Sequence, residues 1–319
     1  MDISVIICTH NPREDYLPRV LEALKTQTLP KEQWELLLVD NASEKPLAGR
    51  VELAWHPNAR HVREEKVGLT HARLRGIVES KGDVLVFVDD DNVLRADYLQ
   101  TCLKLGTDYP WLGAWSGSCI PEFEMEPPAE LRPWLGGLLI EKLATPVWAK
   151  LQRGTEALPP GAGMVVRRKV AGCYRELVLR DPVRQALGRS GKKLGGGEDA
   201  DMALCGFDLG LGTGRFPELE LTHLIPARRV TLEYLEGIYE GFGYANVVTD
   251  TIYKAESFPG KLQSGALRIF LLRILMLITG KSRAERRIRL ALEKGRARGG
   301  RELRQMRYTR PAPVEPSRH

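Results

Sequence analysis

The sequence predicts an α/β protein built on a mostly parallel sheet, and three observations support this class. Short apolar runs alternate with longer amphipathic segments through the first hundred residues. Two of these runs are nearly continuous in Val, Ile and Leu, as expected for strands that are buried on both faces. Polar and acidic residues follow several runs directly, which predicts a ligand site at the carboxyl ends of the strands.

The first ninety residues are expected to contain four strands and two helices. The expected strands are 3–9, 34–40, a weaker run at 50–56, and 83–89. Apolar residues recur with helical spacing in two segments between them, 15–28 and 68–81. Strand–helix alternation of this kind implies right-handed crossovers within one sheet.

The middle of the chain is less regular. Residues 121–160 are rich in proline and glycine and are expected to be irregular, with short helices at most. Further on, 161–171 is interpreted as a glycine turn leading into a strand, and 195–210 as a glycine loop leading into a helix. Residues 218–225 alternate like a strand, and 231–248 have a helical pattern.

The net charge of +6 comes from the C-terminal end. Residues 281–319 contain 13 Lys and Arg against 4 Asp and Glu, whereas the preceding 280 residues contain 34 against 37. The body of the chain is therefore not expected to bind nucleic acid. Five cysteines without a CxxC pair argue against a disulfide framework or a zinc ribbon and favour the cytoplasm. No basic region precedes the first apolar run, so that run is interpreted as a strand rather than a signal peptide.

Three consecutive carboxylates, Asp89, Asp90 and Asp91, end a buried apolar run. Like charges at such a position repel each other unless a cation lies among them. Mg²⁺ and Mn²⁺ prefer carboxylate oxygen and keep phosphate and water ligands. The triplet therefore predicts a divalent cation that also binds a nucleotide diphosphate. A solvated turn or a helix N-cap is the alternative.

Five motifs occur in an order that is informative: SVIICTHNPR, LLLVDNAS, EKVGLTHARLRGI, GDVLVFVDDDN and GGGEDADM. With them the chain resembles a family 2 glycosyltransferase over residues 2–205. The resemblance implies the GT-A fold, a Rossmann-like, mixed, mostly parallel sheet flanked by helices, with a C-terminal helical extension. It also implies inverting, metal-dependent transfer from a nucleotide-diphospho-sugar, by preference a UDP-sugar, to a hydroxyl acceptor in polysaccharide or glycolipid biosynthesis.

The resemblance assigns the nucleotide to eight residues: Thr9, His10, Asn11, Arg13, Asp40, Arg73, Asp89 and Asp90. Asp40 is expected to accept a hydrogen bond from the base, and Arg73 to approach the diphosphate. Leu74 stands where the family usually has Asn, so no polar role is expected there.

The same resemblance assigns the metal and the catalytic base. Asp91 is the expected ligand of Mn²⁺ or Mg²⁺, joined by Asp89 and His223, although a structural role for His223 is the alternative. Asp199 is the expected general base, with Glu198 beside it, because the acceptor hydroxyl must lose a proton as it attacks the sugar. Acidic residues that merely favour a helix N-terminus are the alternative for this pair.

Two further sets of residues are expected near the diphosphate and the transferred sugar. Arg228 and Arg229 are candidates for neutralising the diphosphate from a loop. The donor-sugar and acceptor pocket is expected at four consecutive residues, for which a tight glycine turn is the alternative: Gly161, Ala162, Gly163 and Met164.

Three units are expected: a glycosyltransferase domain at 1–230, C-terminal helices at 231–280, and a basic, partly disordered tail at 281–319. Residues 266–278 are mostly apolar but include two arginines, and are too few to span a bilayer. They are interpreted either as a buried helix or as an interfacial helix, in which case 266–310 would contact an anionic membrane at the inner face of the cell membrane.

The expected partners are therefore a nucleotide-diphospho-sugar and a saccharide or lipid-linked acceptor, with no nucleic acid. A nucleotidyltransferase of similar α/β fold is one alternative, although the loop after the first strand is not rich in glycine and lysine. A non-catalytic scaffold that binds carbohydrate or membrane is another. A processive polysaccharide synthase is not favoured, because the QxxRW motif and long apolar spans are absent from the sequence.

Overall fold

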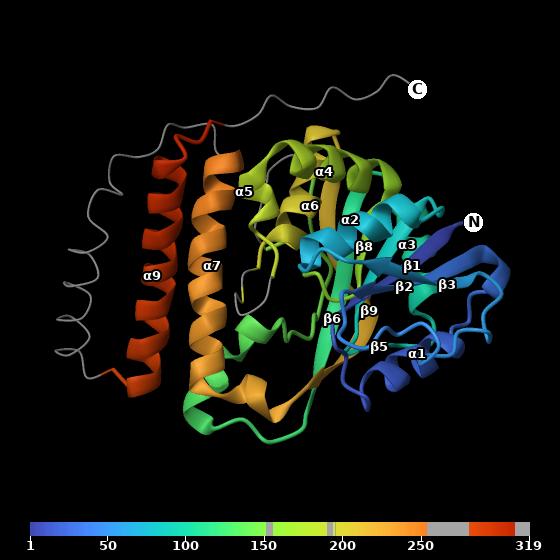
Figure 1. The fold of residues 1–319 in the computed structure, drawn as a ribbon, viewed down its shortest axis with the longest axis horizontal. Helices are drawn as coiled ribbons and strands as arrows, with labels where there is room; N and C mark the ends of the chain where they lie inside the picture. Colours follow the sequence, from blue (N-terminus) through green and yellow to red (C-terminus); the bar gives the residue numbers. More distant parts are fainter. Residues whose placement is uncertain (151–155, 190–193, 195, 254–280, 310–319) are drawn as a thin grey trace.

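The structure is a computed structural model, and it describes residues 1–150, 156–189, 194, 196–253 and 281–309. A single mixed sheet forms the centre of this part of the chain (Figure 1). Its strand order is β3-β2-β1-β4-β8-β6-β9-β5, and β7 pairs with β9. The strands are β1 (Ile3–Thr9), β2 (Trp34–Asn41), β3 (Ala59–Glu64), β4 (Val84–Asp89), β5 (Asn92–Leu94), β6 (Leu112–Phe123), β7 (Val147–Ala149), β8 (Met164–Arg167) and β9 (Gly212–Ile225).

The strand directions confirm the mixed, mostly parallel sheet that the sequence predicts. Strands β1 to β4 are parallel to one another, and β6 is parallel to β9. Strand β8 lies between β4 and β6 and is antiparallel to both. The carboxyl ends of β1, β2, β4, β6 and β9 therefore lie on the same side of the sheet, which is where such sheets bind ligands.

Helices cover both faces of the sheet. The helices are α1 (Leu17–Lys25), α2 (Leu69–Glu79), α3 (Tyr98–Asp108), α4 (Arg168–Arg180), α5 (Pro182–Gln185), α6 (Glu198–Asp208), α7 (Leu232–Tyr253) and α9 (Arg283–Gln305), with 3₁₀ segments η1 (Lys31–Gln33), η2 (Ala129–Leu138) and η3 (Ala227–Val230). Apolar side chains of α1 and α3 form one core cluster with the sheet, and those of α2, α4 and α6 form another. Alternate residues of β1 enter opposite clusters, Val5 the first and Ile6 the second.

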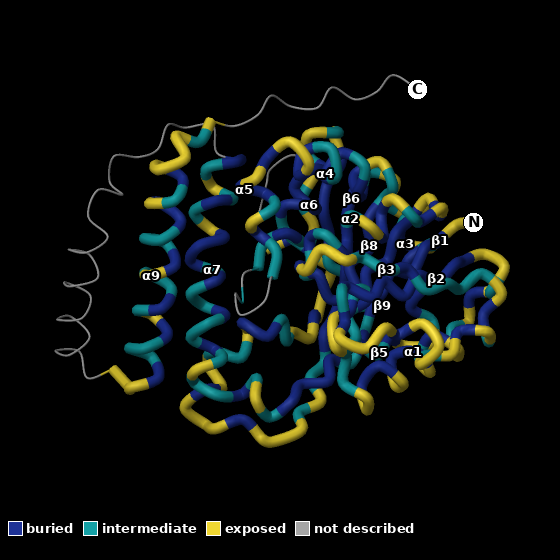
Figure 2. The backbone as a smooth tube through the Cα atoms, viewed as in Figure 1, coloured by how far each residue is buried: buried dark blue, intermediate teal, exposed yellow. Residues whose placement is uncertain are grey.

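Helices α7 and α9 pack lengthwise at one edge of the molecule, with α7 between α9 and the sheet (Figure 1). Their backbones approach closely, since a Cβ atom at Gly243 would overlap the carbonyl oxygen of Leu292, and one at Gly295 would overlap that of Glu240. Arg298 also forms an ion pair with Glu240 at 2.7 Å. Figure 2 shows buried residues concentrated along the strands and along α7. Part of the basic charge at the C-terminal end is thus matched by acidic residues of α7.

The expected strand at 50–56 is wrong. These residues form turns, in which the Val51 N–H donates to the Leu47 carbonyl and the His56 N–H to the Leu53 carbonyl, each at 3.0 Å. The third strand begins only at Ala59, after Pro57. Leu53 is 6% exposed and packs into the core from a turn, so its apolar pattern resembles that of a strand without requiring one.

The regular elements that were not expected from the sequence include α3, β6 and α4. Strand β6 extends to Phe123, into the segment expected to be irregular, and its sequence LGAWSGSCIPEF contains too much glycine, serine and proline for a strand pattern. Strand β8 confirms the strand expected after the glycine turn at 161–163. The helix α4 then begins at once, at Arg168, within the segment 161–171.

The basic C-terminal end is helical over Arg283–Gln305, whereas the sequence analysis expected partial disorder in this segment. Ser282 caps the helix by accepting a hydrogen bond from the Glu285 N–H at 3.1 Å, and the glycine contacts with α7 hold it along its length. Residues 266–278 lie outside the described residues. No helix of the described part is both long and apolar enough to cross a bilayer.

Candidate functional site

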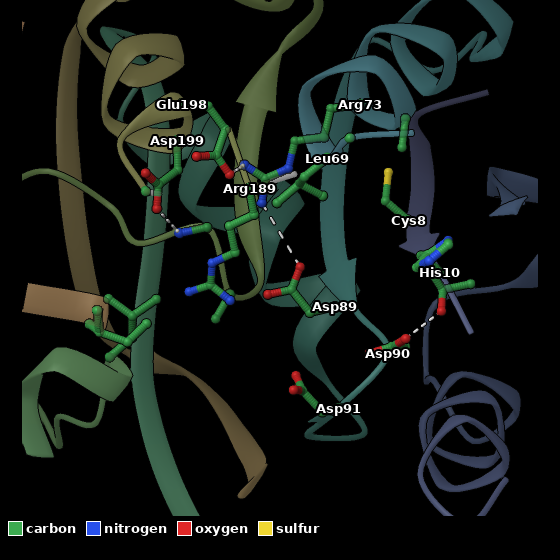
Figure 3. A pocket seen from close by; sticks show the side chains of 18 of the residues that line it. Cys8, His10, Leu69, Arg73, Asp89, Asp90, Asp91, Arg189, Glu198 and Asp199 are labelled. Atoms are coloured by element: carbon green, nitrogen blue, oxygen red, sulfur yellow. Dashed lines mark hydrogen bonds and ion pairs between the residues drawn. The ribbon is translucent and has the colours of Figure 1, made fainter. Parts of the chain in front are cut away.

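The carboxyl ends of β1 and β4 and the start of α6 meet at a cavity of about 310 Å³ (Figure 3). Strands β1 and β4 are parallel neighbours in which Cys8 pairs with Asp89, so the residues that follow both strands lie side by side. Three arginines and five carboxyl groups line this cavity: Arg73, Arg189, Arg229, Asp89, Asp90, Asp91, Glu198 and Asp199. The cavity is therefore strongly charged, with acidic groups in excess.

The three carboxylates of the triplet have different partners. Thr9 donates its hydroxyl hydrogen to Asp90, whose burial, together with the charge of Asp91, raises its pKa to about 7. Although burial opposes ionisation of Asp91, the neighbouring His223 and the charge of Arg229 lower its pKa to about 2. Figure 3 shows Asp89 turned toward Arg73 and away from Asp91. The three carboxylates are therefore adjacent in the sequence but face different partners in the structure.

Arg73, on α2, links the two acidic sides of the cavity. Its Nη1 lies 3.1 Å from Oε1 of Glu198, and its Nη2 lies 3.9 Å from Oδ1 of Asp89. The side chains of Arg73 and Glu198 are 3% and 5% exposed. Burial raises the pKa of Glu198 to about 7 despite the charge of Arg73, and Oε2 of Glu198 has no hydrogen-bond partner among the described residues.

Asp199 lies beside Glu198 in the first turn of α6, and its carboxylate is held from two sides. Oδ2 accepts a hydrogen bond from the Gly161 N–H at 2.8 Å, and Oδ1 accepts one from the Ala200 N–H at 2.8 Å. A Cβ atom at position 161 would lie 2.7 Å from Nη2 of Arg73 and 3.2 Å from Oδ2 of Asp199. Glycine at 161 thus permits Arg73 and Asp199 to approach the same backbone segment.

Several predicted residues lie outside this cavity. The carboxylate of Asp40 accepts hydrogen bonds from the backbone N–H groups of Ser43 and Leu47, both at 3.0 Å, and from Arg63 at 2.7 Å. Asp40 is 3% exposed and does not line the cavity, but its neighbour Asn41 does. The observed contacts of Asp40 order the turn after β2, and its contact with a base stays a prediction.

The remaining predicted residues are divided between the cavity and its surroundings. Asn11 and Arg13 line a second cavity of about 800 Å³ beside α1, and Arg13 is paired with Asp15 at 2.7 Å. Met164 is fully buried in the core, and Gly163, at φ +66°, accepts a hydrogen bond from the Tyr98 hydroxyl at 2.7 Å. The predicted residues that do line the first cavity are Thr9, His10, Arg73, Asp89, Asp90, Asp91, Gly161, Ala162, Glu198, Asp199, His223 and Arg229.

Apolar residues that were not predicted from the sequence also line the cavity. Tyr234, Ile238 and Phe242 line the cavity from α7, next to Leu139 at the end of η2. Leu139 has a left-handed backbone, φ +61°, which is unfavourable for a branched side chain. The spacing of four residues along α7 could have identified one helix face, but nothing in the sequence shows that this face meets the cavity. Arg189 was also missed, since it follows no strand.

Asp91 and His223 are the predicted ligands that remain candidates for a metal site. Within the described residues, no three His, Cys, Asp or Glu side chains form a group that could hold a metal ion. Asp91 and His223 are nevertheless close, with 3.6 Å between Oδ2 and Nε2. Mg²⁺ and Mn²⁺ sites that include a nucleotide commonly use one or two protein ligands and complete the shell with phosphate and water. Asp91 and His223 therefore fit such an ion, whereas Asp89 faces Arg73.

Comparisons with known proteins agree with this architecture. Residues 4–119 match the family model described as Glycosyl transferase family 2. Over 92 residues the chain is 36% identical to glycosyltransferase AglE of Haloferax volcanii, which is 28% of this chain and 30% of that protein. Over 132 residues it is 26% identical to the glucosyl-dolichyl phosphate glucuronosyltransferase of the same organism, which is 40% of this chain and 41% of that protein. The matches thus span less than half the length of these relatives.

The crystal structure of S. aureus TarS 1–349 has a similar fold. It aligns with 99% of this chain and 95% of its own, at a TM-score of 0.50 and 13% identity. The resemblance drawn from the five motifs and the fold class that it implied are both confirmed. Residues 4–119 are therefore similar to glycosyltransferase family 2, and the chain has the GT-A fold.

Proposed function

We propose that the protein transfers a sugar, with inversion, from a nucleotide-diphospho-sugar, preferentially a UDP-sugar, to a hydroxyl group of an acceptor. One observation carries the proposal: Arg73 contacts both Asp89 at the end of β4 and Glu198 at the start of α6, in a cavity that Asp199 also lines. Groups suited to holding a diphosphate and a group suited to removing a proton are thus adjacent.

The donor side of the cavity has the chemistry that a diphosphate requires. Arg73, Arg189 and Arg229 offer N–H groups that match phosphate oxygens. Asp91 and His223 would hold a divalent ion, which as a Lewis acid offsets the charge that develops on the leaving diphosphate. Thr9 and His10, next to the triplet, place the nucleoside on the β1 side of the cavity.

Asp199 is the proposed general base. Its carboxylate lines the cavity and is oriented by the Gly161 N–H, whereas Glu198 is buried and paired with Arg73. The acceptor hydroxyl transfers its proton to Asp199 as its oxygen attacks the anomeric carbon, and the bond from that carbon to the diphosphate breaks on the opposite face. The product therefore has the anomeric configuration opposite to that of the donor.

The acceptor is proposed to enter along α7. Tyr234, Ile238, Phe242 and Leu139 form an apolar and aromatic wall beside Asp199 in the same cavity. The C–H face of a sugar ring or the start of a lipid chain can pack on such a surface while its hydroxyl group reaches the carboxylate. This favours a saccharide or lipid-linked acceptor, as in the synthesis of polysaccharides or glycolipids.

A donor screen tests the proposal. UDP-, GDP- and dTDP-sugars are incubated with the protein and Mn²⁺, nucleotide release is measured, and the product anomer is assigned by NMR. We expect release from a UDP-sugar and an inverted product. Release of pyrophosphate from nucleoside triphosphates would instead indicate a nucleotidyltransferase, binding without turnover would indicate a scaffold, and a retained anomer would exclude Asp199 as the base of an inverting transfer.

Contact of the C-terminal end with an anionic membrane also remains a proposal. Arg283, Lys294 and Arg301 are exposed and are spaced by 11 and 7 residues, so they share one face of α9. Such a face attracts anionic lipid, and salt screens the attraction. In liposome flotation we expect binding to anionic vesicles that decreases with salt. Equal flotation with neutral vesicles would contradict it.

A further inference from the structure

Arg229 occupies the space between the two residues that fit a metal ion. It lies on η3, directly after β9, and its Nη1 is 2.8 Å from Oδ2 of Asp91 and 3.1 Å from Nε2 of His223. An arginine can only donate, so Nε2 of His223 accepts the hydrogen bond from Arg229. The lone pair of His223 that would bind a metal ion is thus directed at a guanidinium group.

The same three groups are shielded from solvent. The side chains of Asp91, His223 and Arg229 are 6%, 7% and 18% exposed. In a buried setting, a divalent ion next to a guanidinium group on one carboxylate would be strongly repelled. Binding of the ion by Asp91 and His223 therefore requires Arg229 to leave them. Arg229 also lines the main cavity, so its guanidinium group can reach a diphosphate that is bound there.

We propose that the guanidinium group of Arg229 binds Asp91 and His223 in the donor-free protein. When the donor binds, the metal ion replaces the guanidinium group at these two residues. The diphosphate attracts the guanidinium away from Asp91, so the metal ion and the nucleotide bind together and not independently. This rests on the proposed nucleotide-diphospho-sugar donor. Arg229 thereby couples the binding of the metal ion to the binding of the nucleotide. Such coupling is reciprocal, because each ligand raises the affinity for the other by the same factor.

Binding of Mn²⁺ to the protein alone provides the first test. Free Mn²⁺ is measured by EPR during titration of the wild type, Arg229→Gln, Arg229→Lys and Arg228→Gln, with circular dichroism confirming that each is folded. Arg228 is the matched control, since it lies on the same turn, is exposed and does not line the cavity. We expect Arg229→Gln to bind Mn²⁺ about 10-fold more tightly than the wild type, within the usual range of coupling between sites. Arg229→Lys, which keeps the charge, and Arg228→Gln should remain near the wild type.

The second test measures the coupling itself. Calorimetric titration of UDP with and without Mn²⁺ should show strong mutual enhancement in the wild type and a smaller enhancement in Arg229→Gln. Adding Asp91→Asn to Arg229→Gln should abolish the gained Mn²⁺ affinity. If wild-type UDP binding with Mn²⁺ is normal but Arg229→Gln leaves Mn²⁺ affinity unchanged, or Arg228→Gln raises it equally, the role of Arg229 is wrong and the proposed function stands. If the wild type binds no UDP even with Mn²⁺, both proposals fail.

Discussion

Helix α6 contributes to two buried arginine–carboxylate pairs whose surroundings differ. Glu198 pairs with Arg73 at the wall of the cavity, whereas Asp201 pairs with Arg184 in the interior, with side chains 0% and 2% exposed. Asp199 and Asp201 are two residues apart, so on a helix they point in nearly opposite directions. One short acidic segment therefore serves both the cavity and the core.

The interior pair is enclosed by the protein. The Tyr253 hydroxyl, from the end of α7, donates to Oδ1 of Asp201 at 2.6 Å, and Asp181 lies 3.6 Å from Nε of Arg184. Tyr308 in turn donates to Asp181 at 2.6 Å. This network joins α5 and α6 to the C-terminal helices. In both pairs one carboxylate oxygen, Oδ2 of Asp201 or Oε2 of Glu198, has no hydrogen-bond partner among the described residues. The pairs differ because Glu198 and the neighbouring Asp199 line the cavity, whereas Asp201 does not. We expect the interior pair, Asp201 and Arg184, to control stability. We expect the cavity pair, Glu198 and Arg73, to control activity.

The sharpest test of this comparison is Asp199→Asn. The variant keeps the shape of the side chain and removes its basicity, so we expect kcat to fall about 10²–10⁴-fold. The contacts assigned to the donor lie elsewhere, so UDP binding should be nearly unchanged. The free energy of unfolding should fall by no more than about 1–3 kcal/mol, because the amide can accept only one of the two backbone hydrogen bonds. Assays of kcat, calorimetry and denaturant unfolding measure the three quantities. Normal turnover of Asp199→Asn alongside an inactive Glu198→Gln would move the base to Glu198.

The interior pair predicts the opposite outcome. Arg184→Met leaves Asp201 buried without its cation, and breaking a buried pair in this way typically costs about 3–5 kcal/mol of stability. Unfolding by urea measures the loss. Arg180→Met is the control, because Arg180 is 61% exposed and pairs with an exposed Glu176 at 3.5 Å, and surface pairs contribute about 0–1 kcal/mol. Similar small losses of stability in both variants would show that the Arg184 network does not stabilise the packing of α5 and α6 on the C-terminal helices.

Glu198 adds a pH dependence to the cavity pair. Its folded pKa, about 7, is above its ordinary value of 4.5 because of burial. Below pH 4.5 the group is protonated in both states; between pH 4.5 and 7 the unfolded chain loses the proton more readily, so stability falls as pH rises, by up to about 3 kcal/mol. Glu198→Gln should remove this decrease, as measured by unfolding at several pH values. The exposed Glu218→Gln should preserve it, and an unchanged slope in Glu198→Gln would contradict the shift.

The donor side of this molecule was predictable because parallel strands end in short polar segments that are contiguous in sequence. Asp89, Asp90 and Asp91 lie at the carboxyl end of one strand and Thr9 and His10 at that of its neighbour, so both the sheet and their proximity could be inferred. Their separate partners could not be inferred: the sequence cannot show that Asp90 turns to Thr9 while Asp91 turns to His223, more than 130 positions away. That difference depends on how β9 and η3 pack.

The acceptor side was less predictable, because its residues come from elements whose relative position is tertiary. Tyr234 and Phe242 lie in a helix that the sequence predicts, but only packing places one face of α7 against the cavity. The same limit applies to Asp201. It lies in the same acidic segment as Asp199, and the sequence does not show that one side chain enters the core and the other the cavity. It applies to Leu53 as well, because the apolar pattern of a buried turn resembles that of a strand.

The smallest expected effect concerns Gly161, which separates Arg73 from Asp199. An alanine Cβ would lie 2.7 Å from Nη2 of Arg73 and 3.2 Å from Oδ2 of Asp199, so Gly161→Ala must displace one of them. Overpacking of this kind costs about 1–3 kcal/mol, and a small misplacement of a catalytic group can lower the rate up to about 10²-fold.

Gly172→Ala is the matched control for Gly161→Ala. A Cβ atom at position 172, within α4, meets no atom within 4 Å, and the change should stabilise the helix by about 0.5–1 kcal/mol without affecting kcat. Unfolding and initial rates are compared for both variants. If Gly161→Ala loses stability but keeps full activity, the displaced atom is Arg73's far nitrogen and not the Asp199 carboxylate. If it keeps both, position 161 tolerates a side chain, and the spacing between the two acidic sides of the cavity is not set by glycine.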